Sequence, residues 1–190
     1  VFWTYPYTPA ATARACCGRV NRGLAILGHT LFMGTLDGNL LAIDARDGRL
    51  LWTTPVGRPE AGYAVTGAPL VVKDKVIAGP AGGEYGIRGH VTAYNAVSGE
   101  QVWRWFSIPA PKGDPTFDPI APNGWWGTWP THTPDGANLN RNVAAEKADS
   151  AKYADAWQRG GGGVWMTPAY DKALNMIYVA VGNPSPDLDG

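Results

Sequence analysis

The two cysteines of this 190-residue chain, Cys16 and Cys17, are neighbours. Neighbouring cysteines can close on each other in an eight-membered ring. That ring adds almost nothing by loop closure, and the roughly 3.8 Å between adjacent Cα atoms is shorter than an ordinary disulfide prefers. Such a bond would offer a stiff, flat and polarisable surface. The dipeptide alone favours the other interpretation, two buried thiols that pack as small hydrophobic side chains.

Zinc chemistry is not indicated by the sequence. There is no Cys-x-x-Cys spacing. The histidines, His29, His90 and His132, are scattered and do not have the spacing of metal ligands.

An eleven-residue pattern occurs twice and indicates the elements that position these residues. The pattern is Ala-x-(Asp/Asn)-x-x-x-Gly-x-x-x-Trp, at 42–52 and 93–103, and the copies lie 51 residues apart. That spacing is in the range of propeller blades. We expect the Asp or Asn to cap a turn, the Gly to supply a positive φ, and the Trp to begin the next strand and pack between blades. These positions are Asp44 and Asn95, Gly48 and Gly99, Trp52 and Trp103.

The composition indicates an all-β fold. With 25 Gly, 16 Pro, 9 Trp and 17% charged residues, the chain suits short strands joined by turns. Strands are predicted at 30–34, 39–43, 69–72, 75–78 and 90–94, and a third unit begins near Val164. We predict a β-propeller of four-stranded blades. A β-sandwich with two similar hairpins is the alternative.

The chain is expected to be a partial propeller domain, 1–190. About three blades are present, and a ring needs at least four. Residues at about 104–163 break the period and are predicted to be an insertion between blades, with a helix at 144–157. Both termini are expected to be cuts through a longer protein.

The charge pattern argues against some partners. The formal net charge is zero, and no basic block suggests nucleic acid or an anionic membrane. No apolar run is long enough to span a membrane.

Five short motifs resemble, in order, those of the PQQ-dependent (pyrroloquinoline quinone) methanol and alcohol dehydrogenases. The resemblance covers Trp3 to Pro186, apart from the insertion, and implies an eight-bladed propeller. The motifs are Cys16-Cys-Gly-Arg-Val-Asn-Arg-Gly23, Val65-Thr-Gly-Ala-Pro-Leu70, Ala81-Gly-Gly-Glu-Tyr-Gly-Ile-Arg-Gly89, Gly160-Gly-Gly-Gly-Val-Trp165 and Gly182-Asn-Pro-Ser-Pro186.

The resemblance implies a binding site for PQQ. A Cys16–Cys17 disulfide would cover one face of the quinone, and Trp165 would stack on the other. Arg22 would hydrogen-bond the quinone, and Thr66 would donate its hydroxyl to a carboxylate. The remaining implied cofactor contacts are Ala81, Gly82 and Gly83.

The resemblance also implies a metal site and a base. Glu84 and Asn183 would supply oxygen ligands to calcium or a lanthanide. Taken singly, Glu84 is typical of solvated surface, Asn183 of a turn and Trp165 of a propeller core. The catalytic Asp is expected beyond Gly190, so no catalytic residue is assigned within the chain.

The sequence departs from the family at two positions. Gly163 stands where many members have Thr, and Ala81 where some have Ser. Each departure removes a hydroxyl that could reach the cofactor.

The implied function is oxidation of a small primary alcohol to an aldehyde by hydride transfer to PQQ. Electrons would pass to a cytochrome c-type acceptor. The resemblance places the protein in the periplasm, and homo-oligomers are compatible with it. The fragment alone is expected to be inactive. Two alternatives remain: a non-catalytic propeller scaffold of the bacterial envelope, and a quinoprotein sugar dehydrogenase.

Overall fold

The computed structural model describes residues 1–118 and 130–185. The chain divides into two compact units. The sheet unit comprises Val1–Ile108 with Arg159–Gly190, and the insertion unit comprises Pro109–Gln158. All the β-strands of the described residues belong to the sheet unit.

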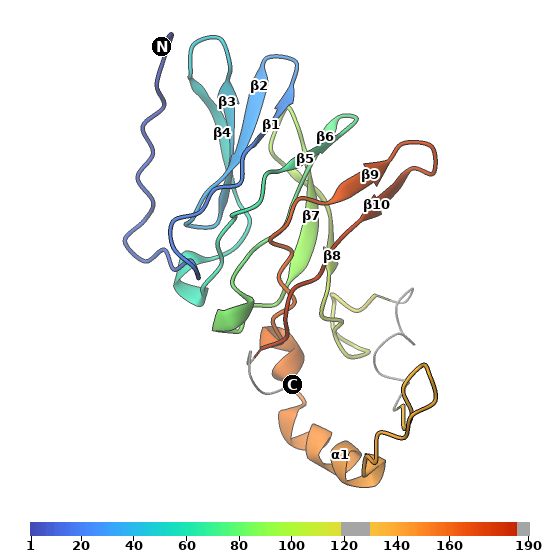
Figure 1. Cartoon of the computed structure of the whole chain (residues 1–190). Coiled ribbons are helices and arrows are strands. Elements are labelled where there is room, and N and C mark those ends of the chain that lie inside the picture. The colour runs from blue at the N-terminus through green and yellow to red at the C-terminus, as the bar shows by residue number, and fades with distance from the viewer. Residues whose placement is uncertain (119–129, 186–190) are drawn as a thin grey trace. The chain divides into compact units, whose positions relative to one another are not determined.

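The sheet unit contains two four-stranded antiparallel sheets, each with its strands in sequence order (Figure 1). A two-stranded antiparallel sheet follows in sequence. This arrangement confirms the predicted all-β fold built from four-stranded units. The first sheet is β1 (Leu24–Leu27), β2 (Thr30–Gly34), β3 (Asn39–Asp44) and β4 (Leu50–Pro55); the second is β5 (Leu70–Val72), β6 (Lys75–Ala78), β7 (His90–Asn95) and β8 (Gln101–Phe106); the third is β9 (Ala169–Asp171) and β10 (Met176–Tyr178).

The repeated pattern forms the same turn in both sheets. The Asp44 carboxylate accepts a hydrogen bond from the Arg46 N–H at 2.9 Å, and Asn95 Oδ1 accepts one from the Val97 N–H at 2.8 Å. The glycines of the two copies have φ values of 76° and 75°, as predicted. Both sheets also shift register at the same place, after Ala42 and after Ala93.

The tryptophan of the pattern does not begin its strand, which corrects one expectation. β4 starts at Leu50 and β8 at Gln101, two residues before each Trp. The register shift next to the turn accompanies this earlier start: strand pairing resumes two residues after each glycine, and the shift lies between that point and the Trp pair.

Trp52 packs against the turn of the second sheet. Its Nε1 donates to the Ala96 carbonyl at 3.2 Å, and a Cβ added to Gly99 would lie 2.7 Å from its ring. Trp3 repeats this contact on the first sheet. Its Nε1 donates to the Ala45 carbonyl at 2.9 Å, and a Cβ on the glycine of that turn would lie 2.6 Å from its ring.

The main hydrophobic core combines residues of the first and second sheets. Fully burying an aliphatic or aromatic side chain contributes roughly 1.5–3 kcal/mol, so this core holds the two sheets together. A smaller cluster joins the second sheet to Tyr170 and Ile177 of the third. The main core comprises Phe32, Leu40, Ala42, Val56, Val65, Val76, Ala78, Tyr94 and Ala96.

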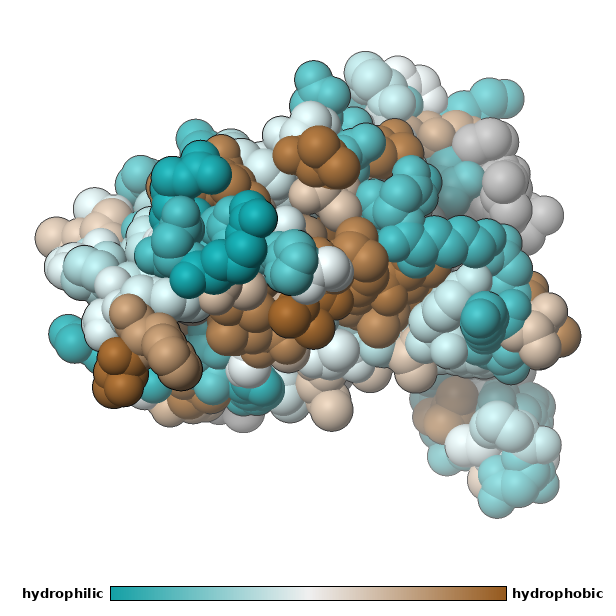
Figure 2. Space-filling view, turned by 90° about the horizontal axis from the view of Figure 1, so that it is seen from above, coloured by the Kyte–Doolittle hydropathy of each residue, from teal (hydrophilic) through white to brown (hydrophobic). Residues whose placement is uncertain are grey.

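Some large apolar side chains of the sheet unit are exposed. Leu24 and Ile26 of β1 are 51% and 60% exposed, while Ala25 between them packs on the main core. Apolar residues also gather in the middle of the surface seen from above (Figure 2). One face of β1 is therefore available for contact with further protein.

The insertion unit contains α1 (Val143–Ser150), and two short 3-10 helices follow it: η3 (Ala151–Tyr153) and η4 (Ala156–Arg159). The predicted helix at 144–157 is thus shorter than expected. A helix with no apolar stripe gains little from packing, and short helices of this kind are marginal. No helix among the described residues is long and apolar enough to cross a membrane.

Candidate functional site

The implied cofactor and metal residues meet at one cavity of the sheet unit, with a volume of about 170 Å³. Ten residues were singled out from the sequence as cofactor or metal contacts, and nine of them line this cavity. Gly83, the tenth, lies between two lining residues. The lining comprises Ala15, Cys16, Cys17, Val20, Arg22, Ala64, Thr66, Ala81, Gly82, Glu84, Trp165 and Asn183.

One wall of the cavity comes from the N-terminal segment, residues 1–23, which forms no helix or strand. Cys16 and Cys17 form a sulfur–sulfur pair in it, with Cα atoms 3.8 Å apart. Cys17 has a φ of 67°. The segment returns to the sheets at Asn21, whose Nδ2 donates to the Gly34 carbonyl at 3.0 Å.

Arg22 and Trp165 lie against each other beside this wall. The Arg22 guanidinium carbon is 4.9 Å from the centroid of the Trp165 ring, a cation–π distance. The Arg22 N–H donates to the Thr66 carbonyl at 3.0 Å. A guanidinium, a flat ring and a hydroxyl-bearing residue are therefore brought together from three distant parts of the sequence.

Thr66 is 5% exposed and follows Val65, a residue of the main core. Among the described residues, its hydroxyl makes no hydrogen bond. Thr66 lines the cavity, and its oxygen is not among the fully buried atoms that lack a partner, so the hydroxyl is available to a ligand there.

Three short backbone segments hold the far side of the cavity. They run side by side through the bridges Arg88–Gly161 and Gly161–Pro184. The Gly162 N–H donates to the Asn183 carbonyl at 2.8 Å, and the Gly182 N–H donates to the Gly163 carbonyl at 2.8 Å. This ladder fixes the backbone on either side of Trp165 and Asn183.

The glycine run at 160–163 is required for this ladder. Gly161 and Gly162 have φ values of 78° and 67°. A Cβ on Gly161 would lie 2.7 Å from backbone atoms of Pro184 and Ser185. A Cβ on Gly163 would lie 2.9 Å from the Pro80 carbonyl oxygen, so a larger residue there would need the local backbone to shift.

Glu84 and Asn183 reach the cavity from two loops in contact. Glu84 lies in the 3-10 helix η2 (Gly83–Tyr85) and is exposed. Asn183 packs on the first residue of that helix, because a Cβ added to Gly83 would be 3.2 Å from Asn183 Nδ2. In the described part of the chain, no three His, Cys, Asp or Glu side chains group as metal ligands. The chain thus supplies two oxygen-bearing side chains, one of them an amide.

Gly82 lets the backbone turn into the cavity. It has a φ of 118°, and a Cβ there would lie 2.1 Å from the Gly62 carbonyl oxygen. Ala81 beside it pairs with Ala64 through two hydrogen bonds of 2.7 and 3.2 Å between their backbones. The departure from Ser at Ala81 therefore leaves its backbone pairing unaffected.

Some parts of the site were missed or fall elsewhere. Ala15, Val20 and Ala64 line the cavity, and no pattern in the sequence distinguished them. Asp187 and Asp189 follow Asn183 closely in the sequence and lie outside the described residues. Arg88 also lies outside the cavity lining: its guanidinium lies over Phe106 at 3.8 Å, and its Nε donates to the Ile108 carbonyl at 2.9 Å.

Comparisons with known proteins agree with this geometry. A family model described as the PQQ glucose/ethanol/alcohol dehydrogenase β-propeller domain matches residues 3–190. The chain belongs to this family. Its sheets are accordingly blades of a quinoprotein β-propeller, and the resemblance drawn from the five motifs is confirmed.

Two relatives illustrate the match. The chain is 41% identical to quinohemoprotein alcohol dehydrogenase ADH IIB of Pseudomonas putida over 187 residues, covering 97% of this chain and 24% of that protein. It is 38% identical to the lanthanide-dependent methanol dehydrogenase of Methylacidiphilum fumariolicum (strain SolV), covering 95% of this chain and 28% of that protein. The chain thus spans about a quarter of the length of these curated relatives.

Solved structures of the family superpose on the chain. The quinohemoprotein alcohol dehydrogenase of Comamonas testosteroni gives a TM-score of 0.77 at 37% identity, covering 97% of this chain and 25% of the other. A europium-containing methanol dehydrogenase gives 0.72 at 36% identity, covering 96% and 30%. The blade arrangement is therefore that of the quinoprotein dehydrogenases.

Proposed function

We propose that the protein containing this chain oxidises a small primary alcohol to an aldehyde, using PQQ and a bound cation. Electrons then pass to a cytochrome c-type acceptor. The observation that carries the proposal is the single cavity lined by the adjacent cysteines, Arg22, Trp165 and Glu84. The names of the relatives support it, since they are quinone- and haem-linked alcohol dehydrogenases.

The residues present fit a planar quinone that carries carboxylates. The flat surface of the Cys16–Cys17 pair and the Trp165 ring suit the two faces of such a molecule. The Arg22 guanidinium presents a fork of donors suited to carboxylate and carbonyl oxygens. The Thr66 hydroxyl has no other partner among the described residues, so it suits a carboxylate of the ligand.

Glu84 and Asn183 would hold the cation. Carboxylate and amide oxygens are the ligands of hard ions, either calcium or a lanthanide. The relatives include one named as lanthanide-dependent and one solved with europium. When bound, the cation and the quinone supply the Lewis acid and the hydride acceptor of the reaction.

The residues of this chain then orient and shield the reacting groups. The wall at Cys16–Cys17 and the Trp165 ring exclude water from the two faces of the quinone, and Arg22 fixes its rotation. An Asp beyond Gly190 is proposed as the base that removes the hydroxyl proton of the alcohol. The chain therefore supplies most of the binding site, and the base comes from outside it.

The cysteine pair also bears on the compartment. We propose that Cys16 and Cys17 form a disulfide in the active protein, which requires an oxidising space such as the periplasm. Assembly as a homo-oligomer is compatible with this proposal, and its test is the mass of the purified protein in solution.

The activity is tested with the full-length protein, reconstituted with PQQ and either Ca²⁺ or La³⁺. We expect reduction of an artificial electron acceptor with ethanol and little with glucose. Preference for glucose would indicate the sugar dehydrogenase alternative. No retained quinone together with two free thiols, measured by non-reducing mass spectrometry, would indicate the scaffold.

The metal role of Glu84 is tested by Glu84→Gln against a matched control. Glu60 is also an exposed glutamate of a 3-10 helix, η1 (Pro59–Ala61), and does not line the cavity. We expect Glu84→Gln to weaken apparent metal affinity by about 10- to 100-fold and Glu60→Gln to leave it unchanged. Equal metal titrations for both variants would contradict the assignment.

A further inference from the structure

The wall formed by Cys16 and Cys17 lies in a segment that lacks the support of a sheet. Residues 1–23 belong to no helix or strand. The hydrogen bonds that fix this segment near the cysteines are therefore few, and each can be named. On the C-terminal side the anchors are Asn21, bonded to the Gly34 carbonyl, and Arg22, whose backbone N–H donates to the Thr66 carbonyl at 3.0 Å.

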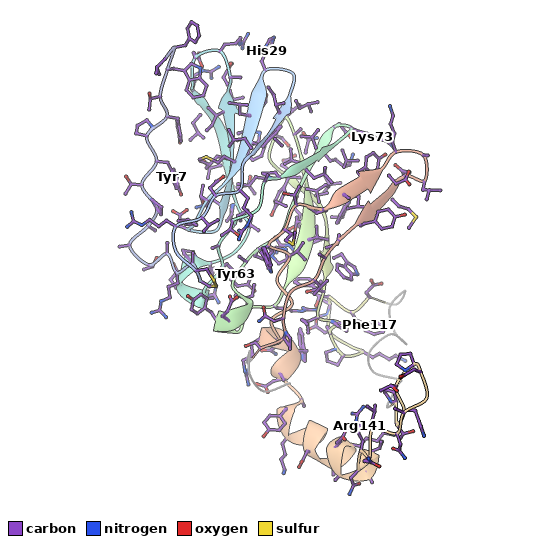
Figure 3. All side chains as sticks on the ribbon, viewed as in Figure 1. Tyr7, His29, Tyr63, Lys73, Phe117 and Arg141 are labelled. Carbon is purple, nitrogen blue, oxygen red and sulfur yellow. A yellow bond between two sulfur atoms is a disulfide. The ribbon has the colours of Figure 1, made fainter. Side chains whose placement is uncertain are left out.

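The anchor on the N-terminal side is the carboxylate of Asp37. It accepts hydrogen bonds from the Ala10 N–H at 3.0 Å and from the hydroxyls of Tyr7 and Thr35. The Ala13 N–H then donates to the Ala10 carbonyl at 2.9 Å, which turns the chain towards Cys16. Figure 3 shows Tyr7 on the N-terminal segment alongside the first sheet.

The partners of Asn21 and of the N-terminal anchor belong to one turn. Residues 34–38, from the end of β2 to the start of β3, form this 34–38 turn, which carries both the Gly34 carbonyl and the Asp37 carboxylate. The same turn also holds the opposite side of the cavity, because the Thr35 carbonyl accepts from the Val65 N–H at 2.8 Å, next to Thr66. Together with the direct bond from the Arg22 N–H to the Thr66 carbonyl, it therefore sets the separation between the cysteine wall and the Thr66 side.

The 34–38 turn has little freedom to move. A Cβ on Gly34 would lie 2.3 Å from Val65 Cγ1, and a Cβ on Gly38 would lie 2.4 Å from the Gly57 carbonyl oxygen. A rigid support is what a positioning residue needs in order to hold a segment that lies outside the sheets.

The environment of Asp37 is unusual for a residue with only a structural role in a turn. The residue is 8% exposed and forms no ion pair in the described ranges, 1–118 and 130–185. Burial raises the pKa of its carboxyl, but the hydrogen bonds from Thr35, Tyr7 and Ala10 outweigh burial and leave that pKa below its usual range. The hydrogen bonds to the Asp37 carboxylate have a charged acceptor, and such bonds are stronger than those between neutral groups.

We propose that Asp37 is a positioning residue for the cofactor: its carboxylate holds the N-terminal segment so that the Cys16–Cys17 wall faces Trp165. The inference rests on the proposed function, since it takes that wall to cover the quinone. Asp37 itself does not line the cavity, so its effect on cofactor binding is transmitted through Ala10 and the turn that follows.

The test is Asp37→Asn in the full-length protein, with Asp44→Asn as the matched control. Asp44 is also a buried turn aspartate, 3% exposed and hydrogen-bonded through its carboxylate, but its partner is Arg46 and it does not line the cavity. Two quantities are measured: the PQQ dissociation constant of the cofactor-free protein, and amide hydrogen exchange in peptides covering residues 10–23.

We expect Asp37→Asn to weaken PQQ binding by about tenfold, the order expected for one lost hydrogen bond to a charged group. Exchange at residues 10–23 should rise in the same variant. Asp44→Asn should change neither quantity, even if it lowers the melting temperature. Unchanged binding and exchange in Asp37→Asn, or equal changes in both variants, would overturn the proposal.

A milder variant covers the case in which Asp37→Asn fails to fold. Tyr7→Phe removes one donor and leaves the carboxylate bonded to Thr35 and Ala10. It should raise exchange at residues 10–23 by a smaller factor, and an unchanged rate would count against the proposal. If the wild-type protein binds no PQQ, the proposed function fails, while the exchange measurements still decide whether Asp37 holds the wall.

Discussion

At the scale of single residues, the cavity depends on backbone conformations that exclude a side chain. Gly82 combines a φ of 118° with a carbonyl oxygen 2.1 Å from where its Cβ would be. The first feature strains any other residue, and the second requires the Gly62 backbone to move. Relief of the collision would shift the Gly82 and Gly62 backbones apart. Since Gly82 and its neighbour Ala81 both line the cavity, this shift would change the shape of the cavity.

We expect Gly82→Ala to lower the free energy of unfolding by about 1–3 kcal/mol and to weaken PQQ binding. Gly113→Ala is the control. Gly113 has a φ of 102°, but no atom of the described residues beyond its chain neighbours lies within 4 Å of the added Cβ, so it carries the strain of positive φ without that collision. Denaturant unfolding and PQQ titration measure both effects. Equal losses of stability and no loss of binding would contradict the role of the collision.

His90 gives the fold a pH dependence. Its ring is buried between Tyr63 and Phe106, at centroid distances of 6.2 and 5.9 Å. Burial, together with the charges of Arg104 and Arg88, lowers the pKa of the imidazole to about 3. In the unfolded chain the group titrates near 6.5. The unfolded state therefore takes up a proton first as the pH falls.

The stability contributed by neutral His90 is complete above about pH 6.5 and is lost as the pH falls towards 3. His90→Gln should make the decline of stability over this window shallower, by up to about 1.4 kcal/mol per pH unit. Urea unfolding from pH 4 to 7 checks the slope. The exposed His29, changed to Gln, should leave the slope as in the wild type.

At the scale of elements, the sequence predicted the strands best where turn chemistry bounded them. The strands at 30–34 and 75–78 have the predicted limits because Asp-Gly and Lys-Asp turns separate them from their partners. β1 (Leu24–Leu27) was missed, since a four-residue apolar run has too little alternation to indicate a strand. The helix was overestimated because propensity alone does not stabilise a polar helix.

The site could not be derived from spacing in the same way. Arg22, Thr66 and Trp165 meet only because the fold brings together three segments that are distant in the sequence, and no local periodicity encodes such a meeting. The resemblance to a family identified them. The role of the 34–38 turn escaped both approaches, since it depends on hydrogen bonds that the Asp37 carboxylate accepts from Tyr7 and Ala10, 30 and 27 positions earlier.

The contact between Trp52 and the next sheet gives a prediction at the same scale. Trp52→Phe keeps an aromatic ring but removes the Nε1 donor to the Ala96 carbonyl. We expect the free energy of unfolding to fall by about 1–2 kcal/mol. Trp105→Phe is the control, because Trp105 is 39% exposed and should cost less than half as much. Equal losses of unfolding free energy in the two variants would show that the hydrogen bond from Trp52 to the second sheet does not contribute to stability.

At the scale of the whole molecule, the chain segments just before and just after the insertion are hydrogen-bonded to each other; we call this contact the neck. Ser107 Oγ donates to the Gly162 carbonyl at 2.6 Å, and the Ser107 N–H donates to the Gly89 carbonyl at 3.0 Å. A Cβ on Gly89 would lie 1.8 Å from the Gly162 oxygen, so the chain on the two sides of the insertion is in direct contact. The contact that joins the two sides of the insertion is therefore made by the sheet unit alone, without residues 109–158.

We expect the sheet unit to keep its stability when residues 109–158 are replaced by a short Gly/Ser linker in the full-length protein. A shorter loop lowers the entropy cost of closure, so the melting temperature should stay the same or rise slightly, by the equivalent of about 1 kcal/mol. Ser107→Ala should cost about 1 kcal/mol with or without the insertion. A loss of several kcal/mol on replacement would contradict this account of the neck.

The paired contacts of Trp3 with the first turn and Trp52 with the second have a consequence for how such a protein can arise. The first sheet provides Trp52 for the turn of the second sheet, and its own turn glycine, Gly48, receives Trp3 from the preceding segment. A duplicated copy of such a unit already carries both halves of the junction, so it joins its parent through an existing contact. Growth by tandem duplication then needs no new interface, and later copies are free to diverge at other positions, such as the cavity-lining Glu84 and Trp165.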